Sequence, residues 1–329
     1  MLRGLKRLNR YENRILSILK NNDELVRLKQ LGFSAKNREG FKFPIHAIEV
    51  GTKKAIQKNP VGLVAGVHGL ETIGIRVLLD FLDYITNPKH SKDFSELEKG
   101  KLGIVCIPIL NPGGVALKSR SNPNGVDLMR NSGIDSEKAV PFLGGHKLSG
   151  KLPYFRGNTL QKESRILQKF VEDYFFKSDG QFMILLDIHS GFGVNDSVWW
   201  PYAGTKKYCE DQPIYEKISK NLLVEKALTK YKFGPQSEIY TAHGDLWDKF
   251  YDDFLEVKRN KKWKPDRKFL PLTLEIGTWA DLKNNPLKIF RKRGLFNPTN
   301  QNKEIFIKAH RDFLTSIVKL TNSKLTDFL

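Results

Sequence analysis

Five short apolar runs limit the folds that this chain can adopt. Each is six to eight residues long and rich in β-branched residues, and most lack the polar alternation of a half-exposed strand. Such runs are typical of strands that are buried on both faces. The runs are PIHAIEV (44–50), VGLVAGV (61–67), GIVCIPIL (103–110), FMILLDI (182–188) and PLTLEI (271–276). The sequence therefore predicts a sheet that is covered on both sides.

Helical patterns lie between or after these runs. Apolar residues recur at helical spacing over residues 75–85, over residues 161–176 and over residues 306–317. Strands that alternate with helices indicate the α/β class. We expect a single-domain three-layer sandwich, with a mixed, mostly buried central β-sheet and helices on both faces.

The N-terminal residues form a less regular pattern. Residues 12–28 carry apolar side chains among charged ones, which predicts a short helix broken near residues 21–23. We expect residues 1–44 to be a helical accessory segment and residues 45–329 to be the main domain. No sequence feature indicates an oligomeric state.

Composition excludes several classes of protein. The 55 basic and 36 acidic residues give a formal net charge of +19, which favours anionic partners without identifying one. Two cysteines, Cys106 and Cys209, exclude a disulfide framework and a four-cysteine zinc site. No apolar stretch reaches the roughly 20 residues of a membrane span, and the N-terminus lacks the apolar core of a signal peptide. We therefore expect a cytoplasmic protein with no membrane partner.

Polar side chains stop three of the five runs. The second run leads into His68 and Glu71, the fourth ends at His189, and Glu275 lies near the end of the fifth. Ligand sites in α/β sheets lie beyond the carboxyl ends of strands. Two histidines and a glutamate would form a catalytic zinc site with one position open for water. On its own, however, the His-x-x-Glu spacing is weak, since Glu71 also suits the first turn of a helix.

Six ordered segments carry a stronger signal. They are HGLE (68–71), NPGG (111–114), NPNGVDLMRN (122–131), DIHSGFG (187–193), GDLWDKFYD (244–252) and LEIGT (274–278). Together they resemble the zinc metallocarboxypeptidases of the carboxypeptidase A and B type, and especially the bacterial branches of that family. The resemblance covers roughly residues 45–280 and implies that the main domain is catalytic.

The resemblance assigns the catalytic centre residue by residue. It implies that His68, Glu71 and His189 bind one zinc ion. It also implies that Glu275 takes a proton from the zinc-bound water and delivers it to the leaving amine. Asp127 matches the carboxylate that orients the first histidine.

Three further residues match the substrate-binding parts of the family. Arg120 matches the arginine that stabilises the oxyanion, and Arg130 the arginine that pairs with the substrate's terminal carboxylate. Tyr251 matches the tyrosine that closes over the substrate. One departure is Met129, which stands where the family has an asparagine and cannot donate a hydrogen bond. The alternatives are surface arginines, a turn aspartate at Asp127 and a half-buried helix tyrosine.

The segment between Tyr251 and Glu275 bears on the substrate. Residues 258–268 are strongly basic, which favours an acidic leaving residue such as glutamate, a D-glutamyl linkage or a diaminopimelate-containing cell-wall peptide. A solvated basic loop explains the same residues equally well. Trp199, Trp200 and Tyr202 are weak candidates for the substrate cleft, because aromatic clusters more often belong to the core.

The sequence therefore predicts a zinc metallopeptidase that hydrolyses a terminal amide bond of a peptide. One alternative is a zinc-dependent deacylase of N-acyl amino acids, similar to aspartoacylase, although those relatives lack much of the tyrosine-bearing loop. Another is a non-catalytic basic protein that binds nucleic acid through phosphate contacts. No zinc-finger, helix-turn-helix or RNP pattern supports nucleic-acid binding.

Overall fold

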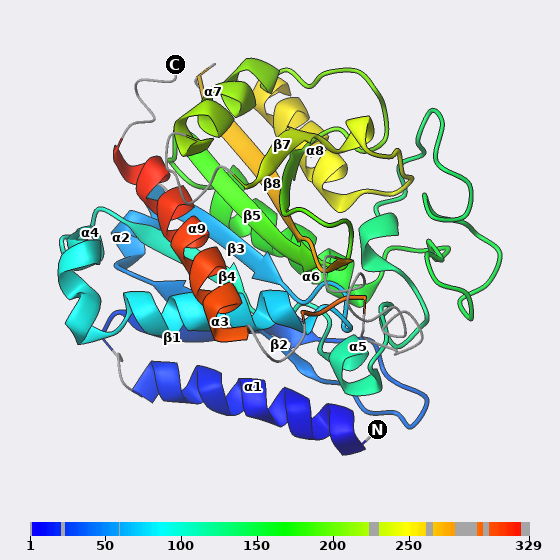
Figure 1. Ribbon diagram of the computed structural model, residues 1–329, viewed down its shortest axis with the longest axis horizontal. Coiled ribbons are helices and arrows are strands. Elements are labelled where there is room, and N and C mark those ends of the chain that lie inside the picture. Colours follow the sequence, from blue (N-terminus) through cyan, green and yellow to red (C-terminus); the bar gives the residue numbers. More distant parts are fainter. Residues whose placement is uncertain are drawn as a thin grey trace.

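The computed structural model describes residues 2–20, 24–58, 60–223, 230–260, 266–279, 295–298 and 303–323. Within these residues a mixed sheet of eight strands runs through the centre, in the order β1-β2-β4-β3-β5-β8-β6-β7 (Figure 1). Helices pack on both faces of the sheet, so the three-layer α/β fold predicted from the sequence is confirmed.

The five apolar runs all lie in strands. The strands are β1 (Val26–Phe33), β2 (Pro44–Val50), β3 (Pro60–Ala65), β4 (Gly103–Ile107), β5 (Phe182–Ser190), β6 (Ser197–Trp200), β7 (Lys232–Pro235) and β8 (Lys268–Ile276). The runs correspond to β2, β3, β4, β5 and β8. The other three lie toward the two edges of the sheet, where short length and exposure weaken the apolar signal.

Nine α-helices occupy the described residues. They are α1 (Leu2–Lys20), α2 (Lys53–Lys58), α3 (Thr72–Ile85), α4 (Ser95–Glu98), α5 (Pro112–Leu117), α6 (Lys162–Val171), α7 (Gln212–Leu223), α8 (Leu246–Asn260) and α9 (Lys303–Ser323). A π-helical turn, η3 (Glu172–Phe176), extends α6, and 3-10 turns occupy Pro88–Phe94, Leu128–Arg130 and Gln236–Glu238. In the described part of the chain, no helix combines the length and hydrophobicity that a membrane span requires.

Four neighbouring strands of the sheet run parallel. β3 pairs in parallel with β4 and β5, and β5 pairs in parallel with β8. The carboxyl ends of these strands therefore meet at one edge. Because of the β5–β8 register, His189 lies opposite Glu275 at that edge.

Side chains alternate between the two faces of the sheet along β5, and this alternation determines the face on which Asp187 and His189 lie. Ile184 and Leu186 pack in the core that contains α3 and α9, which lie side by side in Figure 1. Met183 and Leu185 pack in the opposite core, which contains residues of α6 and α8. Because side chains alternate along a strand, Asp187 and His189 lie on the α6/α8 side.

The N-terminal residues belong to the same body as the rest of the chain. α1 begins at Leu2 instead of residue 12, and Leu8, Ile15 and Ile18 on its inner face join the core of α3. β1 pairs antiparallel with β2, so it extends the central sheet. The described residues of α1 and β1 thus pack with the rest of the fold, and the division into an accessory segment (1–44) and a main domain (45–329) stays a prediction.

We expect the core role of α1 to be visible in stability. Ile15 is 4% exposed and its neighbour Leu16 is 57% exposed, so the two make a matched pair. Ile15→Ala should lower the free energy of unfolding by about 2–5 kcal/mol, because it removes a buried side chain and leaves a cavity. Leu16→Ala should change it by less than about 0.5 kcal/mol. Urea unfolding of both variants measures this, and equal stability of the two would contradict the core placement.

Candidate metal centre and substrate cavity

The loop after β3 brings His68 and Glu71 together. Gly69 lies so close to α5 that a Cβ there would meet the Gly114 carbonyl carbon at 2.0 Å. Glu71 precedes α3 at its N-cap position, but its side chain makes no capping hydrogen bond. The carboxylate is therefore free to reach the histidines.

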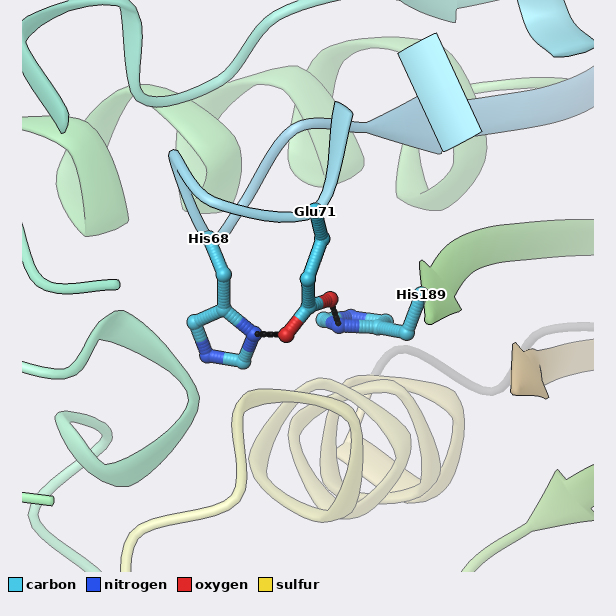
Figure 2. A group of neighbouring side chains, drawn as sticks. All are labelled: His68, Glu71 and His189. Carbon is cyan, nitrogen blue, oxygen red and sulfur yellow. Dashed lines mark hydrogen bonds and ion pairs between the residues drawn. The ribbon is translucent and has the colours of Figure 1, made fainter. Parts of the chain in front are cut away.

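Both oxygens of Glu71 contact histidine nitrogens (Figure 2). Glu71 Oε1 lies 2.7 Å from His68 Nδ1, and Oε2 lies 3.0 Å from His189 Nδ1. Possible ligand atoms of the three side chains all lie within 4.8 Å of one another, and each residue is at most 4% exposed. The structure thus brings together the three residues predicted to bind the metal.

Each histidine also contacts a second carboxylate through its other ring nitrogen, Nε2. His68 Nε2 lies 3.0 Å from Asp127 Oδ1, and His189 Nε2 lies 2.6 Å from Asp187 Oδ2. Trp247 of α8 also donates its indole N–H to Asp187 Oδ2 at 2.9 Å. When Nε2 carries the proton, Nδ1 offers its lone pair to an ion, so these carboxylates favour the ligating tautomer.

Asp187 was not among the residues predicted from the sequence. The signal that could have found it is its position two residues before His189 on a strand, since residues i and i+2 share a face.

The charges in this cluster shift one another's pKa values. Burial raises the pKa of Glu71, but His68 and His189 outweigh it and hold that pKa below its ordinary value. Burial also opposes ionisation of Asp127, whereas Arg120 and His68 bring its pKa well below normal. For His189, burial lowers the pKa, but Asp187 and Glu71 raise it well above normal. Glu71 and Asp127 therefore stay ionised.

This donor set fits a zinc ion. Two imidazole nitrogens and one carboxylate are ligands that zinc prefers, and three protein ligands leave a position open. Three buried carboxylates, Glu71, Asp127 and Asp187, surround the two imidazoles. A divalent cation would balance that concentration of negative charge.

A cavity of about 320 Å³ opens at this cluster. Its walls include the three expected ligands, several charged side chains and several aromatic rings. The lining residues include His68, Glu71, His189, Glu275, Arg120, Arg130, Met129, Tyr240, Asp245, Phe192, Trp199 and Trp279.

Glu275 lines the cavity from the end of β8. Its Oε1 accepts a hydrogen bond from the backbone N–H of Phe192 at 2.9 Å. Burial and the neighbouring Glu71 charge raise the pKa of Glu275 to about 8, although His189 and Arg120 act in the opposite direction. A carboxyl group in such surroundings can exchange a proton near neutral pH.

The two arginines differ in how fully they are bonded. Arg120 donates to Glu71 at 3.0 Å and to Asp127 at 2.8 Å. Arg130 donates to the Met129 carbonyl at 3.2 Å and to the Tyr240 hydroxyl at 3.3 Å, while its buried Nε has no partner among the described residues. Arg130 therefore retains hydrogen-bonding capacity for a ligand.

Tyr251 does not lie at the cavity. Its side chain is fully buried in α8, where its hydroxyl donates to Asp211 at 2.9 Å. The expectation that Tyr251 covers the substrate is therefore wrong about its position. Its one-turn spacing from Leu255 is the signal of a core residue. The tyrosine that lines the cavity is Tyr240, which lies before α8.

The described basic residues of the segment 258–268 also lie away from the cavity. Lys258 and Arg259 pair with Glu210, Lys268 pairs with Asp211, and none of these basic residues lines the cavity. Lys268 begins β8, whereas Glu275 lies at the opposite end of that strand. Residues 261–265 are outside the described residues.

The aromatic candidates divide between cavity and core. Trp199 lines the cavity, whereas Trp200 stacks on Tyr215 with ring centroids 5.3 Å apart.

Comparison with known proteins decides the family. The chain matches the family described as zinc carboxypeptidase over residues 12–276. This chain belongs to the zinc carboxypeptidase family. Zinc is the cofactor of that family of peptide-bond hydrolases, and His68, Glu71 and His189 form a group able to hold it.

Individual relatives are distant. Carboxypeptidase SOL1 of Arabidopsis thaliana is 23% identical over 238 residues, which are 69% of this chain and 43% of that protein. The chain thus spans less than half of this plant relative.

Two solved structures show the same fold. Thrombin activatable fibrinolysis inhibitor has a TM-score of 0.70 at 19% identity, covering 95% of this chain and 73% of that one. Carboxypeptidase A of Helicoverpa armigera has a TM-score of 0.65 at 17% identity, covering 92% and 69%.

We expect Asp187 to strengthen metal binding through His189. Asp187→Asn removes the negative charge from the side chain whose Oδ2 contacts both His189 and Trp247, so the histidine is oriented less firmly and becomes a weaker base. Zinc affinity should fall by roughly 10–100-fold, the usual loss for such a partner. Competition with a chelator measures it, and Asp253→Asn on α8 is the control. Wild-type affinity in Asp187→Asn would contradict the role.

Proposed function

We propose that this chain is a zinc-dependent carboxypeptidase that hydrolyses the terminal amide bond of a peptide. The observation that carries the proposal is the single cavity in which His68, Glu71 and His189 meet the carboxyl group of Glu275. Glu275 is close enough to influence the charge of Glu71, but it is not part of the ligand group.

The proposed chemistry divides between the ion and the chain. Bound zinc would polarise the substrate carbonyl and lower the pKa of water. Glu275 would accept the proton of the attacking water and pass it to the leaving nitrogen. Its raised pKa suits both acceptance and return of that proton. Arg120, at the edge of the ligand group, would stabilise the negative charge that develops on the carbonyl oxygen.

Arg130 would provide the exopeptidase character. A guanidinium can pair with both oxygens of a carboxylate, and Arg130 is 3% exposed with an unpartnered Nε. Met129 beside it offers only a thioether, so Arg130 would bind the terminal carboxylate without an amide neighbour. Arg130 donates a hydrogen bond to the hydroxyl of Tyr240. Tyr240 would therefore cover the substrate in place of Tyr251.

The proposed substrate is a peptide. A deacylase of N-acyl amino acids shares the ion and Glu275, but the Tyr240-bearing loop favours the peptidase. The hypothesis of an acidic leaving residue rested on residues 258–268, and the described basic residues of that segment make contacts away from the cavity. The expected cytoplasmic location stays a prediction.

The catalytic role of Glu275 has a direct test. Glu275→Gln keeps the shape of the side chain but cannot accept a proton, so peptide hydrolysis should fall by about 10²–10⁴-fold. Because Glu275 is not one of the ligands, zinc content should stay at one ion per chain. Turnover of a benzoyl-dipeptide and metal analysis measure both quantities. Removal of zinc by a chelator should abolish the wild-type activity reversibly.

Glu216→Gln on the exposed face of α7 is the control, and it should behave as the wild type. Loss of metal together with activity in Glu275→Gln would point to a structural role. Undiminished hydrolysis would exclude Glu275 as the proton acceptor.

A further inference from the structure

Three arginines gather where α1 packs on α3. Arg7 and Arg10 lie one turn apart on α1, and Arg76 lies in the second turn of α3. The two helices contact each other and run in the same direction (Figure 1). Arg14 of α1 pairs with Asp83 of α3 at 3.4 Å. Because Arg7 and Arg76 precede these two residues by the same length of helix, about two turns, the same packing brings Arg7 beside Arg76.

No acidic partner pairs with these arginines within the described part of the chain. Asp80 and Asp83 of α3 are paired with Arg14 and with Arg311 of α9. The single acidic residue of α1, Glu12, lies on another face of the helix, since each residue turns the helix by about 100°. α5, which also packs on α1, contains no acidic residue. These helices therefore leave the positive charge of the three arginines uncompensated.

Two buried donors at this place lack an acceptor. Arg7 is partly buried, and its Nη1 atom is fully buried without a hydrogen-bond partner among the described residues. One turn further along α1, Tyr11 is only 4% exposed, and its hydroxyl also has no partner there. Residues four apart on a helix are neighbours on one face. Because unpaired buried donors cost free energy, both call for an acceptor that these residues do not supply.

The electrostatics of Arg7 agree with a missing anion. Burial is the main cause that lowers the pKa of Arg7, and the charges of Arg76 and Arg10 lower it further, whereas Tyr11 acts in the opposite direction. An anion bound between the two helices would favour the charged form of each arginine. Arg14, two turns along the same interface, already has such partners in Asp80 and Asp83.

We propose that Arg7, Arg76 and Tyr11 form a binding site for a phosphate group, with Arg10 at its exposed edge. A phosphate offers several acceptor oxygens, and guanidinium groups bind it through paired hydrogen bonds. Its double negative charge compensates three cations better than a single carboxylate does. None of these residues lines the cavity at the metal centre, so the site is separate from the proposed hydrolysis and does not depend on it.

Calorimetric titration of the zinc-loaded protein with inorganic phosphate tests the inference. The wild type should bind phosphate, and Arg7→Gln and Arg76→Gln should each weaken binding by at least about tenfold, because each removes charge-assisted hydrogen bonds. Tyr11→Phe removes one neutral donor and should weaken binding by about two- to tenfold.

Arg14→Gln is the matched control. It removes the same charge from the same helix, but this arginine is already paired with Asp80 and Asp83. Its affinity for phosphate should stay within about twofold of the wild type, since exposed and partly exposed ion pairs contribute little. Equal weakening in Arg14→Gln and Arg7→Gln would show only a general attraction to the basic protein and would overturn the site.

Two other results would also overturn it. One is a wild type that binds no phosphate. The other is binding that is lost in Arg130→Gln but kept in Arg7→Gln and Arg76→Gln, because the phosphate would then lie in the cavity. If Arg7→Gln fails to fold, Arg76→Gln on the other helix decides. Binding is measured without turnover, so the test remains decisive even if the protein hydrolyses no peptide.

The same phosphate chemistry occurs in soluble phosphate compounds and in lipid headgroups, and vesicles distinguish these sources. Phosphatidylcholine vesicles that contain phosphatidic acid present a phosphomonoester at their surface. If the ligand is a headgroup, Arg7→Gln should co-sediment with these vesicles less than the wild type and Arg14→Gln do. If the ligand is soluble, the three proteins should co-sediment equally while their affinities for free phosphate still differ.

Discussion

The central constraint on this structure is the shared carboxylate of Glu71. Each of its oxygens meets one imidazole, and each imidazole is backed by a further carboxylate, Asp127 or Asp187. Buried anions at this density require compensating positive charge. Arg120 supplies one part by bonding both Glu71 and Asp127, and a divalent ion between the histidines would supply the rest. These contacts determine most of the charge distribution at the cavity.

The strand order of the sheet brings the residues of the site together. Parallel pairing of β3, β5 and β8 brings three carboxyl ends to one edge, and the β5–β8 register places His189 opposite Glu275. Trp247 joins Asp187 on β5 to α8, the helix that Asp245 caps.

Much of this site could be predicted from the sequence, because the strand-ending residues His68, His189 and Glu275 follow strongly apolar runs. Asp187 was missed because it is embedded in a motif whose other members drew attention, and because one of its partners, Trp247, lies 60 residues away in the chain. Tyr251 was misplaced because a motif match does not tell which face of a helix is buried. β1 was missed because exposure hides its pattern. The sequence of the basic segment 258–268 could not reveal that Lys258 and Lys268 pair with Glu210 and Asp211.

The claim on which the account depends is that one ion joins His68, Glu71 and His189. The most direct measurement is anomalous X-ray diffraction at the zinc absorption edge from crystals of the zinc-loaded protein. The account predicts a single strong peak bonded to Nδ1 of both histidines and to the Glu71 carboxylate, with Nε2 of each histidine still on Asp127 or Asp187. A peak at other residues, or ligation through Nε2, would contradict it.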